Sequence, residues 1–192
     1  MDKAIIGLIG VVLGACLTLL KEWLFQCIKN KKEYEYLSIR ISCMLDSFIA
    51  GCANVVQDDG TSHGQYDPDG YAKIQVETPS FDPESIEVEW KSLPAKLMYE
   101  ILNFPNEVET ANQIINSTFE YDDPPEYGEG FQERQYQYAH LGIKAYKLAT
   151  KLRNLSKLPQ KEFIKWNPIE HMKTKIINIE TLRNNRDIET VT

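Results

Sequence analysis

The longest apolar run of the chain lies at its N-terminus. Residues 4–20 carry no charged side chain, and roughly 17 apolar residues are the lower end of what crosses a bilayer as a helix. Trp23 and Phe25 follow shortly afterwards and suit the interface between membrane and water. The pattern therefore predicts a membrane anchor over residues 1–28.

Apolar positions continue at helical spacing after this run. They recur every three or four residues, at Tyr34, Leu37, Ile41, Met44, Phe48, Cys52 and Val55. Steps of three and four place side chains on one face of a helix. We therefore expect a juxtamembrane helix over residues 29–57 that continues from the anchor into a folded body.

Three more apolar series with the same spacing follow. They are Leu97, Ile101, Phe104, Val108, Ala111 and Ile115; Tyr138, Leu141, Ala145, Leu148, Leu152 and Leu155; and Ile169, Met172, Ile176 and Ile179. Each series suits one helix of a bundle. We expect a helical bundle over residues 84–184 and a frayed tail over residues 185–192, because chain ends have few neighbours to pack against.

Proline and capping residues divide the predicted helices. Pro105 lacks the backbone donor that a helix interior needs, so we expect two helices or one sharp kink there, with Asn106 capping the second piece. Segments 123–126 and 167–170 each offer a capping side chain, proline at the first helical position and glutamate at the third. Both segments predict helix starts, but Gly128 and Gly130 weaken the first one, so we expect its firm helix to begin only near Phe131.

Residues 58–83 break the helical pattern. The segment is rich in Asp, Gly, Pro and Ser, which favour turns, and it predicts a long acidic loop. Alternation over residues 71–76 predicts one short strand or hairpin arm. The whole pattern predicts an all-α fold, with a single N-terminal transmembrane helix followed by a small cytoplasmic helical bundle with one long irregular loop.

Charges beside the anchor predict its orientation. Lys3 is the one basic residue before the apolar run, whereas Lys21, Lys29, Lys31 and Lys32 follow it. Lysines next to a span tend to stay in the cytoplasm. We therefore expect a single-pass protein of a bacterial-type inner membrane with its C-terminal domain in the cytoplasm.

The net charge of −7 conceals a division between two parts of the chain. Residues 46–133 hold 19 acidic and 3 basic residues, whereas residues 134–192 hold 12 basic and 5 acidic residues. Lys144, Lys147 and Lys151 in the basic part are expected first to lie on a solvated face or against the acidic middle, and second to meet anionic lipid headgroups. Nucleic acid is not an expected partner, because the acidic chain shows no recognisable nucleic-acid-binding fold.

Small residues recur inside the anchor. Gly10 and Gly14 form a Gly-x-x-x-Gly motif, which Thr18 continues at the same spacing. Small residues four apart let two helix backbones approach closely in a membrane. This face predicts self-association through the anchor.

The cysteines bear on whether the chain is exported or stays in the cytoplasm. Residues 13–16, Leu-Gly-Ala-Cys, resemble the lipobox of bacterial lipoproteins, which implies acylation of Cys16 and export. Cys43 and Cys52 instead fall on one predicted helix, roughly 13 Å apart, which is too far for a disulfide. Free thiols suit the reducing cytoplasm, and we expect the cysteines to be small buried apolar residues.

Oxygen ligands gather in the predicted loop. Asp58, Asp59, His63, Asp67 and Asp69 lie near glycine turns, as ligands do in calcium sites. An EF-hand register fails, because its first and last ligand positions would carry glutamine and valine. Asp-Gly pairs are also ordinary turn residues, so metal binding stays open.

The sequence carries no recognised catalytic or nucleotide-binding motif, and no cofactor is predicted. We expect a membrane-anchored cytoplasmic interaction or regulatory module that binds the lipid bilayer and either a protein partner or a second copy of itself. Two alternatives remain. One is an exported cell-envelope lipoprotein acylated at Cys16, and the other is an enzyme with a carboxylate-based site in the acidic middle, which requires converging acids with raised pKa values.

Overall fold

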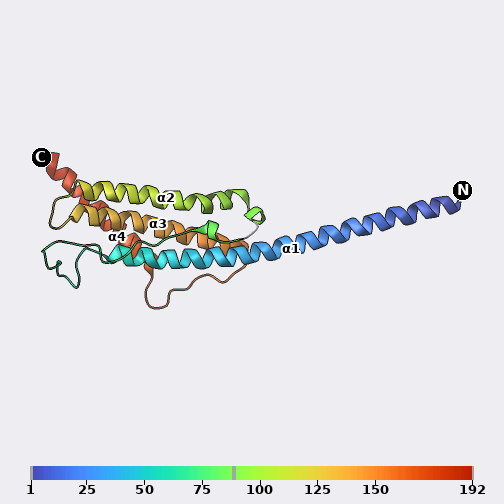
Figure 1. The fold of residues 1–192 in the computed structure, drawn as a ribbon, viewed down its shortest axis with the longest axis horizontal. Helices are drawn as coiled ribbons and strands as arrows, with labels where there is room; N and C mark the ends of the chain where they lie inside the picture. Colours follow the sequence, from blue (N-terminus) through green and yellow to red (C-terminus); the bar gives the residue numbers. More distant parts are fainter. Residues whose placement is uncertain (1, 88–89, 192) are drawn as a thin grey trace.

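The computed structural model describes residues 2–87 and 90–191 of the 192-residue chain, with side chains from Leu13 to Arg186 outside that gap. Its elements are α1 (Asp2–Gln57), η1 (Pro83–Ser85), η2 (Trp90–Ser92), α2 (Ala95–Glu120), α3 (Gly128–Leu155) and α4 (Pro168–Val191) (Figure 1). The described residues form no β-strand. The all-helical prediction is confirmed.

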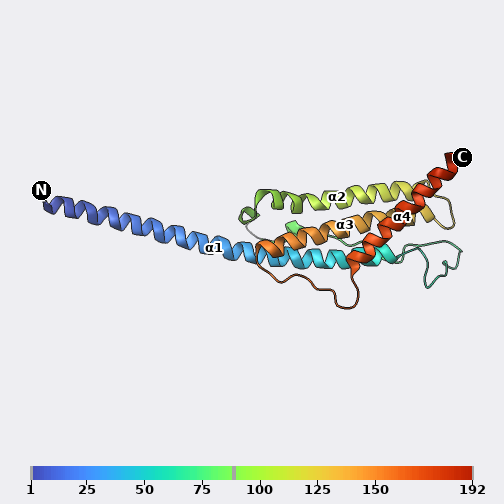
Figure 2. The same cartoon turned by 180° about the vertical axis from the view of Figure 1, so that it is seen from behind.

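Helix α3 is the centre of the body. It packs against α1, α2 and α4, and most extensively against α1. The chain direction of α3 is opposite to that of α1 and α2, while α4 crosses at an angle (Figures 1 and 2). Only the second half of α1 joins this bundle, and its first half projects away from the body in both views.

The predicted apolar series supply most of the core. Leu37, Ile41 and Phe48 of α1 are buried, as are most members of the later series. Phe48 stacks edge to face with Phe104 of α2 at a centroid distance of 5.2 Å, and with Phe81 of the long loop at 6.2 Å. Such aromatic contacts add to apolar burial. The loop therefore contributes to the core it runs beside.

Three helices come closest at one glycine. A Cβ atom added to Gly142 of α3 would lie 2.5 Å from Sδ of Met172 and 3.0 Å from Cβ of Cys52. These two neighbours belong to α4 and α1. Because real Cβ atoms essentially never approach another heavy atom within 3.0 Å, only glycine fits here without movement of Met172.

Helix α2 corrects the expectation at Pro105. The helix continues through this residue from Ala95 to Glu120, so of the two predicted alternatives the two-helix one is wrong, while the kink stays a prediction. Asn106 lies inside the helix, and its amide donates to Oδ1 of Asn103 at 3.3 Å instead of capping a new start. An interior proline costs about 3 kcal/mol. The fully buried Ile101 and Phe104 offset that cost on the preceding turn.

The two predicted helix starts have different outcomes. In α4, Oδ1 of Asn167 accepts hydrogen bonds from the backbone N–H groups of Ile169 at 3.0 Å and Glu170 at 3.4 Å, so this cap is confirmed. Helix α3 begins at Gly128 rather than at the paired prolines, and Oδ2 of Asp122 accepts from the N–H of Gly130 at 2.7 Å. The helix therefore starts after the predicted cap at residues 123–126 and three residues before Phe131, where the firm helix was expected.

The chain after residue 57 is irregular as far as Pro83, as predicted. Residues 71–76 do not form the predicted strand, because the N–H groups of Gln75 and Val76 donate to the carboxylate of Asp58 rather than to another strand. At the other end of the chain, α4 continues to Val191, although fraying was expected from residue 185.

Candidate functional site

The first half of α1 presents an apolar surface without a partner in the described protein. Every described residue from Leu13 to Lys32 is exposed. Its large apolar side chains are Leu13, Leu17, Leu19, Leu20, Trp23, Leu24, Phe25 and Ile28. Helix α1 as a whole is long and apolar enough to cross a membrane, by length and composition, but among its described side chains the apolar window that meets this test is half buried and reaches into the bundle. This exposed segment is called the anchor segment below.

The glycine face of the anchor segment is open. A Cβ atom added to Gly14 would meet nothing within 4 Å, and the hydroxyl of Thr18 donates to the carbonyl of Gly14 at 3.0 Å. A hydroxyl bonded inside its own helix is inexpensive to bury. The surroundings of Gly10 lie outside the described side chains, and self-association of this face stays a prediction.

The cysteines are free, as expected, but they are not all buried. Cys16, Cys27 and Cys43 are exposed, whereas Cys52 is buried. Burial raises the pKa of the Cys52 thiol. The expectation of small buried residues is therefore wrong for the exposed cysteines, because all three face away from the bundle core.

The metal-candidate residues of the loop act locally instead of converging. Asp59 accepts hydrogen bonds from the N–H and the hydroxyl of Thr61, at 3.0 and 2.7 Å. Asp67 accepts from the N–H groups of Asp69 and Tyr71, at 3.0 and 2.7 Å, and pairs with Lys73. These are ordinary turn-stabilising contacts.

His63 is exposed, and it has a left-handed backbone with φ of 54°. The Asp58 side chain is buried and pairs with Arg134. Among the residues that the structure describes, no group of three or more His, Cys, Asp or Glu side chains is arranged to hold a metal ion.

A buried ion pair joins the loop to α3. The side chains of Asp58 and Arg134 are 0% and 1% exposed, and Nη1 of Arg134 lies 2.8 Å from Oδ2 of Asp58. The same carboxylate accepts from the N–H groups of Gly60, Gln75 and Val76, each at 3.0 Å. Arg134 also donates to the carbonyl of Val76. This network satisfies both charges and fixes the two ends of the loop's first half.

Sequence reasoning missed this ion pair. The two residues are 76 positions apart, and an acidic loop offers many equivalent partners for any arginine. One signal was available. Arg134 lies four residues before Tyr138 and three after Phe131, on the face of α3 that turns inward, where a charge requires a partner.

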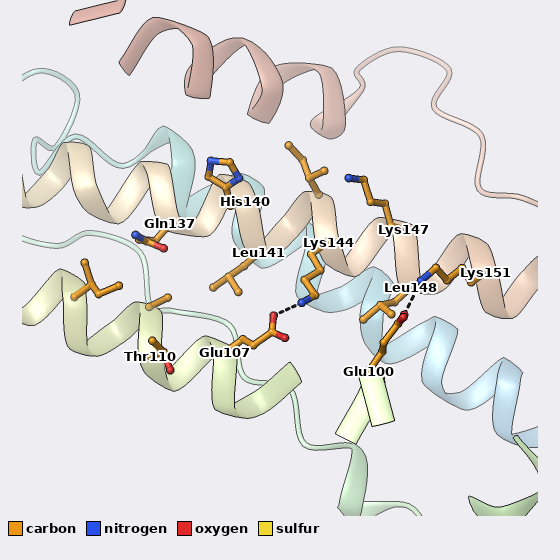
Figure 3. A pocket seen from close by; sticks show the side chains of 13 residues that line it. Glu100, Glu107, Thr110, Gln137, His140, Leu141, Lys144, Lys147, Leu148 and Lys151 are labelled. Carbon is orange, nitrogen blue, oxygen red and sulfur yellow. Dashed lines mark hydrogen bonds and ion pairs between the residues drawn. The ribbon is translucent and has the colours of Figure 1, made fainter. Parts of the chain in front are cut away.

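A groove of about 650 Å³ lies between α2 and α3. Its lining includes the buried apolar residues Ala111, Leu141 and Leu148. Figure 3 shows Lys144 and Lys151 of α3 reaching across to Glu107 and Glu100 of α2, with which they form ion pairs. This arrangement is called the α2–α3 groove below.

These ion pairs show what two lysines of the basic last third of the chain contact. Lys144 and Lys151 face the acidic middle, which confirms the first expectation for those two lysines. Lys147 points away from both glutamates in Figure 3. Further ion pairs of this kind join Arg153 to Asp46, with an N to O distance of 2.6 Å, and Arg183 to Glu133, with an N to O distance of 2.5 Å.

The two carboxylates of the α2–α3 groove do not converge on one point. Glu100 and Glu107 lie seven residues apart on α2, each beside its own lysine. The pKa of Asp59 is lowered, first by the hydrogen bond from the Thr61 side chain, and that of Asp67 is lowered, first by the bond from Lys73. A general acid would need the opposite shift.

The built features of the described residues are thus the anchor segment, the Asp58–Arg134 pair and the α2–α3 groove. The first faces outward and is apolar. The Asp58–Arg134 pair is buried and joins the long loop to α3. The third is open and lined by paired charges around an apolar floor. No protein-family model matches the chain, and neither a curated protein nor a solved structure does.

Proposed function

We propose that the chain is a single-pass membrane protein that holds its helical body at the membrane surface, where the body acts as an interaction or regulatory module. The exposed anchor segment carries this proposal. The uncharged residues 4–20 of α1 span roughly 26 Å at 1.5 Å per residue. That length is at the lower end of what crosses the ~30 Å hydrocarbon core of a bilayer.

The energetic argument rests on what the anchor segment would expose in water. Eight large apolar side chains from Leu13 to Ile28 are between 52% and 65% exposed. Full burial of one such side chain contributes about 1.5–3 kcal/mol, so their transfer to lipid is favourable by on the order of 10 kcal/mol. No other exposed segment of the described chain concentrates apolar side chains in this way.

The orientation follows from the lysines after the anchor segment. Lys29, Lys31 and Lys32 are exposed on the side of the segment nearer the body. Lys29 and Lys31 lie 3.7 and 3.8 Å from Glu33 and Glu35, but acidic residues have little influence on topology. A cytoplasmic body in a bacterial-type inner membrane is therefore the proposed arrangement.

The body supports an interaction role more than a catalytic one. The α2–α3 groove has an apolar floor between charged walls, which suits a peptide or helix better than a small substrate. The anchor offers the second contact, through its open Gly14 face. A protein partner or a second copy of the chain is thus the proposed ligand class.

The lipoprotein alternative meets a physical obstacle. Acylation at Cys16 would leave Leu17, Leu20, Trp23 and Phe25 on the exported side, where the structure gives them no covering residues. A lipid on Cys16 does not require such an apolar continuation. The transmembrane arrangement buries these side chains and the acylated one does not.

Fusion proteins test the proposal. A reporter that fluoresces only in the cytoplasm, fused after Thr192, should give fluorescent membranes that resist alkaline carbonate extraction. The parallel fusion to a phosphatase that is active only after export should be inactive. Active phosphatase fusions, or labelling of Cys16 by a radioactive lipid precursor that a Cys16→Ser variant abolishes, would establish the lipoprotein instead.

A further inference from the structure

A second pocket lies between the long loop, α2 and α3. Its volume is about 590 Å³, which falls within the roughly 300–1,000 Å³ of typical ligand pockets. The loop contributes residues 74 and 76–78, α2 contributes residues between positions 109 and 119, and α3 contributes Arg134. It shares no lining residue with the α2–α3 groove. This cavity is called the loop pocket below.

Buried polar contacts hold both walls of the loop pocket against α3. On the loop wall, the N–H of Val76 donates to the carboxylate of Asp58 at 3.0 Å, and Arg134 donates to the Val76 carbonyl. On the α2 wall, the hydroxyl of Tyr138, a buried residue of α3, donates to Oδ1 of Asn112 at 2.7 Å. The lining is thus positioned before any ligand arrives, which lowers the cost of binding.

The charges of the loop pocket favour a cation. Glu77 and Glu109 are exposed in its lining, and neither forms an ion pair with another described residue. Arg134 brings a positive charge to the lining, but the buried carboxylate of Asp58 lies 2.8 Å from it and neutralises it. The lining therefore keeps two uncompensated negative charges, whereas the glutamates of the α2–α3 groove are paired with lysines.

The uncharged part of the lining indicates what else the cation carries. Ile115 is buried, Phe119 is partly buried and Ile74 is 55% exposed, so apolar surface borders the pocket on both the loop and the α2 side. Asn116 is exposed and adds an amide carbonyl that accepts hydrogen bonds. An arginine side chain matches this set, because its stem is apolar and its planar guanidinium donates to carboxylates and stacks on aromatic rings.

We propose that the loop pocket binds an arginine side chain of a protein partner, with apolar neighbours of that arginine covering Ile74 and Phe119. The inference rests on the proposed function, since it names the chemistry of the partner that an interaction module requires. A free amine would satisfy the two carboxylates but would leave the apolar walls uncovered. The acidic middle of the chain, with 19 acidic and 3 basic residues over residues 46–133, attracts such a partner over a longer distance.

The test uses the full chain in nanodiscs of phosphatidylcholine, a lipid without net charge that does not attract basic peptides. The probe is a fluorescein-labelled peptide of seven residues in which leucine and arginine alternate, and binding is followed by fluorescence anisotropy at physiological ionic strength. The probe should bind saturably. An analogue with glutamate in place of arginine should not bind, and an analogue with serine in place of leucine should bind about tenfold more weakly, because it buries less apolar surface.

Substitutions in the chain separate the loop pocket from acidic surface in general. Glu77→Gln with Glu109→Gln removes both uncompensated charges and should weaken binding about fivefold, a modest loss because exposed ion pairs are individually weak. Glu120→Gln with Glu126→Gln removes the same charge from exposed residues outside the lining, and should weaken binding less than twofold. Asn116→Trp adds bulk at an exposed position of the lining and should weaken binding about tenfold, with an unchanged midpoint of thermal unfolding.

Each other outcome overturns the inference. Equal losses from the two pairs of glutamine substitutions, or full binding by Asn116→Trp, would show that the attraction is not located in the loop pocket. A parent chain that binds no probe, or one from which arginine ethyl ester displaces the probe at equal concentration, would exclude a peptide partner at this site. These results leave the anchoring intact. A chain that binds the probe but is extracted from membranes by carbonate contradicts the anchor instead, and leaves the loop pocket as proposed.

Discussion

The two halves of α1 are one continuous helix in two different surroundings. From Leu13 to Lys32 every described residue is exposed, whereas Leu37, Ile41, Leu45 and Phe48 are at most 1% exposed. Both halves are rich in apolar residues, but only the second half alternates them with polar positions at helical spacing. Composition alone makes both halves resemble a membrane span, and the periodicity shows which half has a protein partner.

The largest expected effect concerns the first half. Leu13→Arg with Leu17→Arg places two charges in the proposed span, where a charge near the centre costs about 2.5–3.5 kcal/mol. The double variant should lose most of its membrane-bound fraction in carbonate extraction. Ile39→Arg is the control in the second half, where the side chain is 45% exposed outside the proposed span, and it should stay membrane-bound. Full membrane retention of the double variant would contradict the anchor.

The second half responds to a different kind of change. Phe48→Ala removes a ring that is 1% exposed and contacts Phe81 and Phe104, so it should cost about 3–5 kcal/mol. The midpoint of thermal unfolding in detergent should fall by about 6–20 °C. Phe25→Ala is the matched change in the anchor segment, where the ring is 63% exposed. An equal fall with Phe25→Ala would show that the two halves are not energetically distinct.

Glycine substitutions also compare the body with the anchor segment, with a smaller expected change in stability. Gly142→Ala forces a Cβ against Met172 and Cys52, and overpacking of this kind costs about 1–3 kcal/mol. Gly14→Ala in the anchor segment meets open space and should leave the unfolding midpoint of the body unchanged. If Gly142→Ala leaves the midpoint unchanged too, the close approach of α1, α3 and α4 is looser than described.

Most of the helices could be predicted because their signals are local. The apolar series of α1 needs only residues within a few turns, and the cap at Asn167 needs only the next three residues. Pro105 misled the prediction because the burial of Ile101 and Phe104, which outweighs the proline, is a tertiary effect. The Asp58–Arg134 pair could not be predicted, since no local pattern selects one partner across 76 residues.

The anchor was the part of the candidate site that sequence could predict best. A membrane span is determined by the hydropathy of consecutive residues, so it requires no knowledge of the fold. The α2–α3 groove depends on which faces of two helices meet. Its lysines were singled out from the sequence, but their glutamate partners emerge only when α2 and α3 are placed side by side.

Lysines give the smallest and last test of the comparison between the anchor and the body. Lys144 and Lys151 are paired with Glu107 and Glu100, whereas the lysines at the end of the anchor segment are exposed. Exposed pairs contribute only about 0–1 kcal/mol each. Reversing both lysines to Glu should therefore lower the unfolding midpoint by a few degrees, and added salt should narrow the difference because it screens the new repulsion.

The matched change separates the two roles of lysine. Lys147 points away from both glutamates, so Lys147→Glu should leave the midpoint and its salt response close to those of the parent. Replacing Lys29, Lys31 and Lys32 by Gln should also leave the midpoint unchanged, but it should weaken the orientation of the span and raise the fraction of exported phosphatase fusion. A lower midpoint with an unchanged topology would assign these three lysines to the fold of the body. Lysines would then stabilise the fold in both regions. Charge would no longer distinguish the anchor segment from the half of α1 that joins the body.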